Sequence, residues 1–97
     1  MKFVQILEFT TSRMDEMDKV EAEWRAKTEG RNTVVRQLKV KDRDKPNTYL
    51  IIVEFDSYED AMKNNELPET NEISAAMQKL ADGPATFRNL DVLEEVS

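Results

Sequence analysis

The chain has 97 residues, the length of a single domain. Its 14 basic and 20 acidic residues are spread along the sequence and give a net charge of −6, which argues against nucleic-acid and anionic-membrane partners because these need clustered lysine and arginine. With no cysteine and no histidine, the sequence excludes disulfides, thiol nucleophiles, imidazole catalysis and histidine-ligated zinc or haem.

The first predicted element is a strand over residues 2–10. Apolar residues alternate there, with Gln5 on the same side as Phe3, Leu7 and Phe9, and with Val4 and Ile6 on the other side. Ser12 followed three residues later by Asp15 is typical of a helix start. Apolar residues at helical spacing then predict a helix over 13–28. The apolar residues at this spacing are Met14, Met17, Val20 and Trp24.

The opposite face of this predicted helix carries charged pairs four residues apart. They are Asp15/Lys19, Glu21/Arg25 and Glu23/Lys27. Such pairs are typical of a solvent-exposed helix face, where each adds roughly 0.2–0.5 kcal/mol to helix stability. We therefore expect these residues to point away from the core.

Two further strands are predicted at residues 33–41 and 48–55, joined by a charged turn at 42–47. Their similar lengths and short connection predict a hairpin. Residues 49–53 of the third strand are apolar without alternation, which indicates a central strand covered on both faces.

A second helical region follows. Ser57 with Asp60 repeats the helix-start pattern and predicts a short helix over 58–63. We expect residues 64–68 to interrupt it, with Asn64-Asn65 either as a plain break before Pro68 or as a flexible lid over a pocket. A longer helical stretch is predicted at about 70–82, where Asp82-Gly83-Pro84 ends it.

The last strand is predicted over 85–95. Its apolar residues change side between Phe87 and Leu90, which predicts a β-bulge. The resulting order, β-α-β-β-α-β, predicts one α+β domain over residues 1–97 with the ferredoxin-like fold, in which a four-stranded antiparallel sheet has its helices on one face.

The sheet face without helices should then be apolar as well. In the first and third strands, apolar residues point to both sides, so whichever face the helices leave open carries an apolar patch. A large apolar patch on a monomer usually marks an interface. We therefore predict a homodimer formed through the open sheet face.

The chain resembles the dimeric α+β barrel superfamily, in the group of antibiotic-biosynthesis-monooxygenase-like domains. The resemblance covers the whole element order, and its most specific piece is Phe55-Asp56-Ser57-Tyr58-Glu59-Asp60-Ala61 at the exit of the third strand. It implies a small-molecule pocket between sheet and helices. Its haem-degrading members need a histidine that this chain lacks, whereas its cofactor-independent oxygenases of aromatic substrates do not.

Five residues are candidates for ligand binding. Gln5 and Tyr49 could hydrogen-bond a ligand, Arg36 could bind a carboxylate, and Trp24 could line a pocket for an aromatic ring. Asn64 belongs to the possible lid. Each also has a structural alternative: a local hydrogen bond for Gln5, an ion pair for Arg36, a core position for Trp24 and Tyr49, and a helix break for Asn64.

Two functions remain open at this point. The first is a homodimeric domain that binds or oxidises a small apolar or aromatic molecule without a cofactor or metal. The second is a non-catalytic dimerisation or regulatory module. A sequence without an apolar run of membrane-spanning length or a signal-peptide pattern predicts a cytoplasmic protein. An open pocket with converging polar groups would favour the first function, and a filled space would favour the second.

Overall fold

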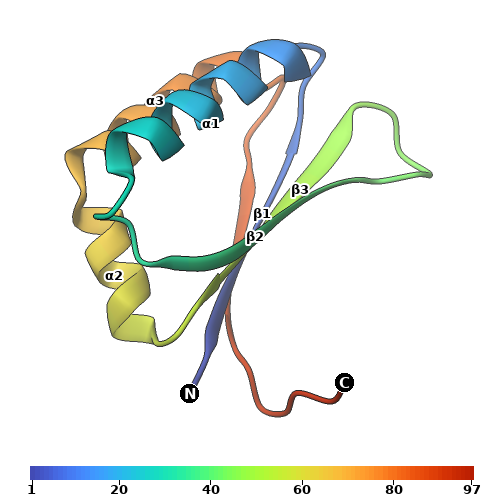
Figure 1. The fold of residues 1–97 in the computed structure, drawn as a ribbon. Helices are drawn as coiled ribbons and strands as arrows, with labels where there is room; N and C mark the ends of the chain where they lie inside the picture. Colours follow the sequence, from blue (N-terminus) through green and yellow to red (C-terminus); the bar gives the residue numbers. More distant parts are fainter.

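The computed structural model describes all residues from 1 to 97. Its elements are β1 (Phe3–Thr10), α1 (Met14–Thr28), β2 (Val34–Lys41), β3 (Thr48–Phe55), α2 (Tyr58–Glu66), α3 (Pro68–Leu80) and β4 (Thr86–Asp91). The three helices lie on one side of the sheet, with α1 and α3 side by side (Figure 1). None of the helices combines the length and the apolar character needed to cross a membrane.

The four strands form one antiparallel sheet in the order β2-β3-β1-β4. This arrangement confirms the predicted ferredoxin-like fold, with the first and third strands at the centre and β2 and β4 at the edges. The hairpin between β2 and β3 is also confirmed. Asn47, in its turn, has a φ of 54°, a left-handed conformation that asparagine adopts more readily than most residues.

One of the two predicted helix starts is confirmed and one is wrong. The Ser57 hydroxyl oxygen accepts a hydrogen bond from the Asp60 backbone N–H at 3.1 Å and caps α2. Ser12 makes no such bond, and α1 begins after Arg13 without a side-chain cap. The neighbouring Thr11 is fully buried, and its hydroxyl oxygen accepts from the Arg13 backbone N–H instead.

The predicted interruption over residues 64–68 is confirmed at Leu67, but its predicted start at Asn64-Asn65 is wrong. Helix α2 continues through both asparagines to Glu66, and the chain bends at Leu67, after which Pro68 occupies the first turn of α3. Proline has no backbone N–H to donate and disfavours helical geometry in the residue before it, so the break falls at Leu67.

The predicted bulge in the last strand is also wrong. β4 pairs with β1 in an unbroken register from Thr86 to Asp91, so Phe87 faces the helices and Leu90 faces away. The β4 strand ends at Asp91 rather than at residue 95. The irregularity lies in β2, where Val35 is an extra residue between Val34, opposite Phe55, and Arg36, opposite Glu54.

The face of the sheet beneath the helices carries a small, divided core. One cluster contains Phe9, Met17, Ile51 and Met77, and the other contains Phe3, Phe55 and Ala61. These seven are the only apolar residues that are buried. A core this small leaves part of the space between the two layers unfilled.

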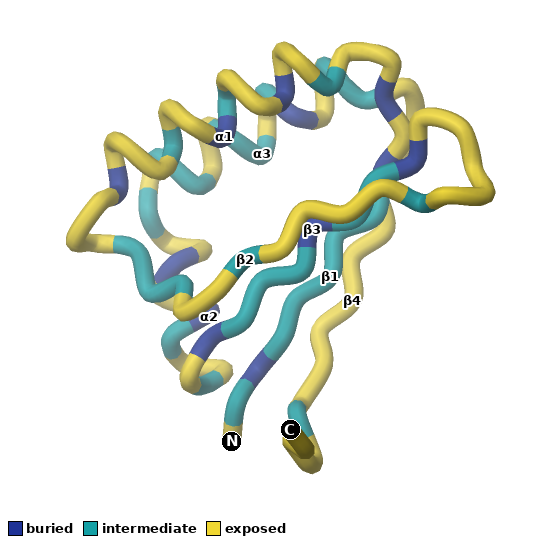
Figure 2. Tube along the Cα trace, turned by 45° about the vertical axis from the view of Figure 1, so that its right-hand side comes forward, coloured by how far each residue is buried: buried dark blue, intermediate teal, exposed yellow.

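The opposite face of the sheet is uncovered. Its cross-strand rows include Leu38, Ile52 and Ile6 from β2, β3 and β1, and Val40 beside Leu50. Leu38 and Val40 are exposed. Figure 2 shows the two edge strands largely exposed and the two central strands mostly in intermediate burial. The centre of the open face is therefore apolar, as the sequence predicts, whereas Arg36, Glu54, Glu8 and Arg88 add charged groups to the same face.

Candidate functional site

A cavity of about 740 Å³ lies between the sheet and the helix layer. This volume is in the range of small-molecule sites, roughly 300–1,000 Å³. Of its 25 lining residues, 13 are hydrophobic, so the wall is mainly apolar with a limited set of polar groups.

The apolar wall comes from both layers. The sheet contributes side chains from β1, β3 and β4, and the helices contribute side chains from α1 and α3. The main apolar residues are Leu7, Phe9, Met17, Trp24, Ile51, Val53, Phe55, Ile73, Met77 and Phe87. The cavity opens on the side of α3 and β4, where Gln78, Phe87 and residues 82–84 are exposed.

Glu21 is a buried carboxylate on the cavity wall. Its side chain is 4% exposed. Oε2 accepts a hydrogen bond from the Gln37 side-chain N–H at 3.2 Å and lies 3.5 Å from Lys39 Nζ and 3.7 Å from Arg25 Nη1. Oε1 is buried and has no partner. Burial raises the pKa of Glu21, although Lys39 and Arg25 act in the opposite direction.

Asn64 is a second cavity-lining residue with an unpartnered buried oxygen. Its side chain comes from α2, the residue is 6% exposed, and its Oδ1 has no hydrogen-bond partner. An unsatisfied buried oxygen costs roughly 1–3 kcal/mol. The unpartnered oxygens of Glu21 and Asn64 are both shielded from solvent within the lining of the cavity.

Gln5 lies in the cavity, as the sequence suggests for a ligand-binding amide. It stands on β1 directly opposite Asn89 of β4, and its Nε2 donates a hydrogen bond to Asn89 Oδ1 at 3.2 Å. The local hydrogen bond orients the Gln5 amide on the cavity wall.

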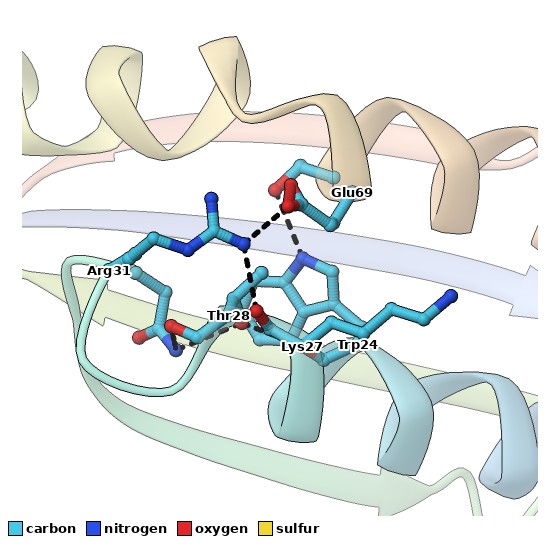
Figure 3. A network of polar contacts seen from close by, with 7 residues as sticks. Trp24, Lys27, Thr28, Arg31 and Glu69 are labelled. Atoms are coloured by element: carbon cyan, nitrogen blue, oxygen red, sulfur yellow. Dashed lines mark hydrogen bonds and ion pairs between the residues drawn. The ribbon is translucent and has the colours of Figure 1, made fainter.

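Trp24 also lines the cavity, where its ring adds to the apolar wall. Its indole N–H donates to the Thr70 hydroxyl oxygen at 3.0 Å, which connects α1 to α3. Beside this contact, Arg31 forms an ion pair with Glu69 and donates to the Lys27 carbonyl oxygen (Figure 3). The Arg31 hydrogen bond lowers the pKa of Glu69. These contacts hold together the ends of the two helices that form the cavity roof.

The other two candidates lie elsewhere. Arg36 sits on the open sheet face beside Glu54, with 3.4 Å between its Nε and Glu54 Oε2. The bulge at Val35 places Arg36 on this face, away from Val34. Tyr49 stacks on Phe9 at a ring distance of 6.1 Å and packs against the core outside the cavity. The structure therefore does not bring Arg36 and Tyr49 together with Gln5, Trp24 and Asn64 in the cavity.

Sequence reasoning missed Glu21, which it assigned to the exposed helix face. The spacing of residues 17, 21, 24 and 28 along α1 contained the signal, because residues separated by three or four positions share one helix face. Met17 and Thr28 are fully buried and Trp24 lines the cavity, so Glu21 faces inward with them. The Glu21/Arg25 ion pair exists, but only Arg25 is exposed.

The comparisons with known proteins identify the fold. No family model and no curated protein matches the sequence. A proposed antibiotic biosynthesis monooxygenase from Caulobacter crescentus CB15 superposes with a TM-score of 0.82 at 14% identity, over 96% of this chain and 91% of that one. SnoaB, a cofactor-independent oxygenase from Streptomyces nogalater, gives a TM-score of 0.81 at 18% identity over 98% and 96% of the chains.

A third similar structure is Rv0793 from Mycobacterium tuberculosis, with a TM-score of 0.81 at 13% identity over the full length of both chains. These identities establish a likeness of fold and not of activity. The chain has the ferredoxin-like fold of antibiotic-biosynthesis-monooxygenase-like proteins, and the resemblance stated from the sequence is confirmed at that level.

Proposed function

We propose that this protein binds a small apolar or aromatic molecule in the cavity between its sheet and its helices. The observation that carries the proposal is the cavity itself, which has a volume of about 740 Å³ and is lined by apolar side chains together with polar ones such as Gln5 and Thr70. A filled interlayer space would have favoured a purely structural module. The open cavity supports ligand binding instead.

The reaction class that we propose for this cavity is cofactor-independent oxygenation of the bound ring. SnoaB, whose fold this chain shares, is a cofactor-independent oxygenase. Oxygen uptake by the purified protein in the presence of a hydroxylated naphthalene would test this step. Unchanged oxygen levels alongside measurable binding would leave ligand binding as the function and remove oxygenation.

We also propose that the protein acts as a homodimer joined through the open sheet face. The exposed row that contains Leu38 supports this surface as the contact.

A cavity-filling variant tests the binding proposal. Ser74 lines the cavity, and its neighbour Ala75 is exposed on the same helix. We expect Ser74→Phe to abolish the increase in melting temperature that 2-naphthol gives to the wild-type protein, because the added ring occupies the site. Ala75→Phe, the matched control, should retain the full increase. Equal responses from the two variants would place any binding outside the cavity.

A further inference from the structure

The strands place four charged residues on the open face of the sheet. They are Glu8 of β1, Arg36 of β2, Glu54 of β3 and Arg88 of β4. Glu54 is engaged within the chain, since its two carboxylate oxygens lie 3.2 Å from Lys2 Nζ and 3.4 Å from Arg36 Nε. Glu8 and Arg88 form no ion pair with any residue of the chain. The open face therefore keeps one unpaired anion and one unpaired cation.

Both unpaired charges stand in cross-strand rows that are otherwise mainly apolar. From β2 to β4, the first row contains Leu38, Ile52, Ile6 and Arg88, and the second row contains Val40, Leu50, Glu8 and Thr86. Leu90, two residues after Arg88 on the same face of β4, is also exposed. Apolar side chains thus lie beside Arg88 both along its strand and across it, so a partner that covers the rows also covers the two charges.

A second copy on this surface has to compensate both charges. An ionised group that is buried without a partner is strongly destabilising, so each charge needs an opposite charge from the covering surface. Two-fold symmetry makes the covering surface identical to the covered one. Of the two carboxylates that the strands offer there, Glu54 is already paired. Glu8 is the one left for Arg88, and Arg88 is the cation left for Glu8.

We propose that two copies of this chain pack with their two-fold axis between the two rows, so that Arg88 of each copy pairs with the partner's Glu8. Because Glu8 and Arg88 are diagonal neighbours on β1 and β4, an axis between them forms the pair twice. The same axis lays the Leu38 end of one row on the Val40 end of the partner's other row, apolar against apolar. The inference rests on the proposed homodimer and deepens it by fixing the register in which the copies meet.

Reversal of either charge tests the pair. Arg88→Glu places two carboxylates at each of the two contacts, and Glu8→Arg places two guanidinium groups there. Each variant alone should raise the dissociation constant of the dimer by roughly a hundredfold or more, because like charges that face each other across an interface repel strongly. Sedimentation velocity over a series of protein concentrations measures this constant.

The decisive experiment mixes the two variants. In a dimer of one Arg88→Glu chain and one Glu8→Arg chain, a carboxylate meets a guanidinium group at both contacts, so the mixture should dimerise with nearly the wild-type affinity. Within each chain the two reversed positions still carry like charges. Recovery on mixing therefore requires contact between the copies and would not follow from an ion pair inside one chain.

The matched controls reverse charges on the exposed face of α1. Lys19→Glu and Glu23→Lys change the net charge by the same amounts as the two test variants, and both residues are exposed and outside every ion pair of the chain. Each control should dimerise like the wild type, alone and mixed. The same loss and recovery in the controls would assign the effect to net charge and overturn the pair.

Folding of each variant is checked by circular dichroism. If a reversed chain does not fold alone, the two chains are produced together with different affinity tags. A folded dimer with one chain of each kind then supports the pair, and failure to form one overturns it.

The outcomes separate this inference from the proposed homodimer. If the wild type is dimeric and the reversed variants keep its affinity, or if they lose it and mixing restores nothing, the Arg88–Glu8 contact is overturned and the dimer stands. If the wild type is monomeric, the proposed homodimer fails and the inference fails with it.

Discussion

At the scale of single residues, burial and partners decide which side chains form the site. Gln5 and Trp24 lie in the cavity with hydrogen bonds to Asn89 and Thr70 that fix their orientation. Arg36 is on the other face of the sheet, because one extra residue in β2 reverses the side on which it lies. Glu21 has the environment least typical of its residue type, a buried carboxylate with one free oxygen.

The buried Glu21 makes stability depend on pH. Because its pKa is raised in the folded state, its contribution to stability is fully present below the unfolded-state value, near 4.5, and is lost as the pH rises through the folded-state pKa. Glu21→Gln lacks this titration. We therefore expect the wild type to lose stability relative to Glu21→Gln between about pH 4.5 and neutrality.

Urea denaturation of both proteins at several pH values measures this difference. The two proteins have the same charged groups around position 21, namely Lys39, Arg25 and Asp18. Glu23→Gln serves as the exposed control and should show no comparable trend. A difference in unfolding free energy that stays constant with pH, or that changes with the opposite sign, would contradict the raised pKa.

At the scale of elements, local signals set the helices and strands, but tertiary contacts move their ends. The two Ser-x-x-Asp sequences are alike, yet only Ser57 caps a helix. At the start of α1, Thr11 makes the side-chain hydrogen bonds instead of Ser12. Its hydroxyl group is fully buried, donates to the Leu80 carbonyl oxygen at 2.7 Å and accepts from the Arg13 backbone N–H. This contact links the start of α1 to the end of α3.

The two serines provide a matched pair of variants. Ser57→Ala removes the only side-chain cap of α2 and should lower the free energy of unfolding by about 0.5–2 kcal/mol. Ser12→Ala removes an exposed hydroxyl group that makes no capping bond and should change stability by less than about 0.5 kcal/mol. Equal losses in chemical denaturation would show that the two positions do not differ as described.

At the scale of the whole molecule, the sheet is the layer that both proposals share. Its covered face bounds the cavity, and its open face carries Leu38, Ile52 and Ile6 in one cross-strand row. A second copy of the chain packed on the open face would remove this row from water while it leaves the opening beside Phe87 on the helix side of the sheet. Dimerisation and ligand entry are therefore compatible.

Ile52, at the centre of this row, is the position that tests the dimer. Light scattering of the wild type should give twice the 11.3 kDa chain mass. Ile52→Arg should give the mass of one chain and a lower melting temperature, because the charge would be buried in the interface without a partner. Ala75→Arg, on the exposed side of α3, should remain dimeric. A wild type that is monomeric at micromolar concentration would refute the dimer.

The sequence by itself determined the element order, the central positions of the first and third strands, the apolar patches on both sheet faces and three residues of the cavity, Gln5, Trp24 and Asn64. Periodicity carries this information, because side chains alternate along a strand and recur every three or four residues along a helix. The same local rules gave the cap at Ser57.

Only the tertiary structure decided the position of the β2 bulge, the inward orientation of Glu21 and the size of the cavity. A bulge depends on how two strands pair, and the sequence of one strand does not specify that pairing. A buried carboxylate on a helix rich in charged pairs has the same sequence pattern as an exposed one. The cavity depends on how far the helix layer stands from the sheet, which the packing of Met17, Met77 and Ile51 sets at one end of the core.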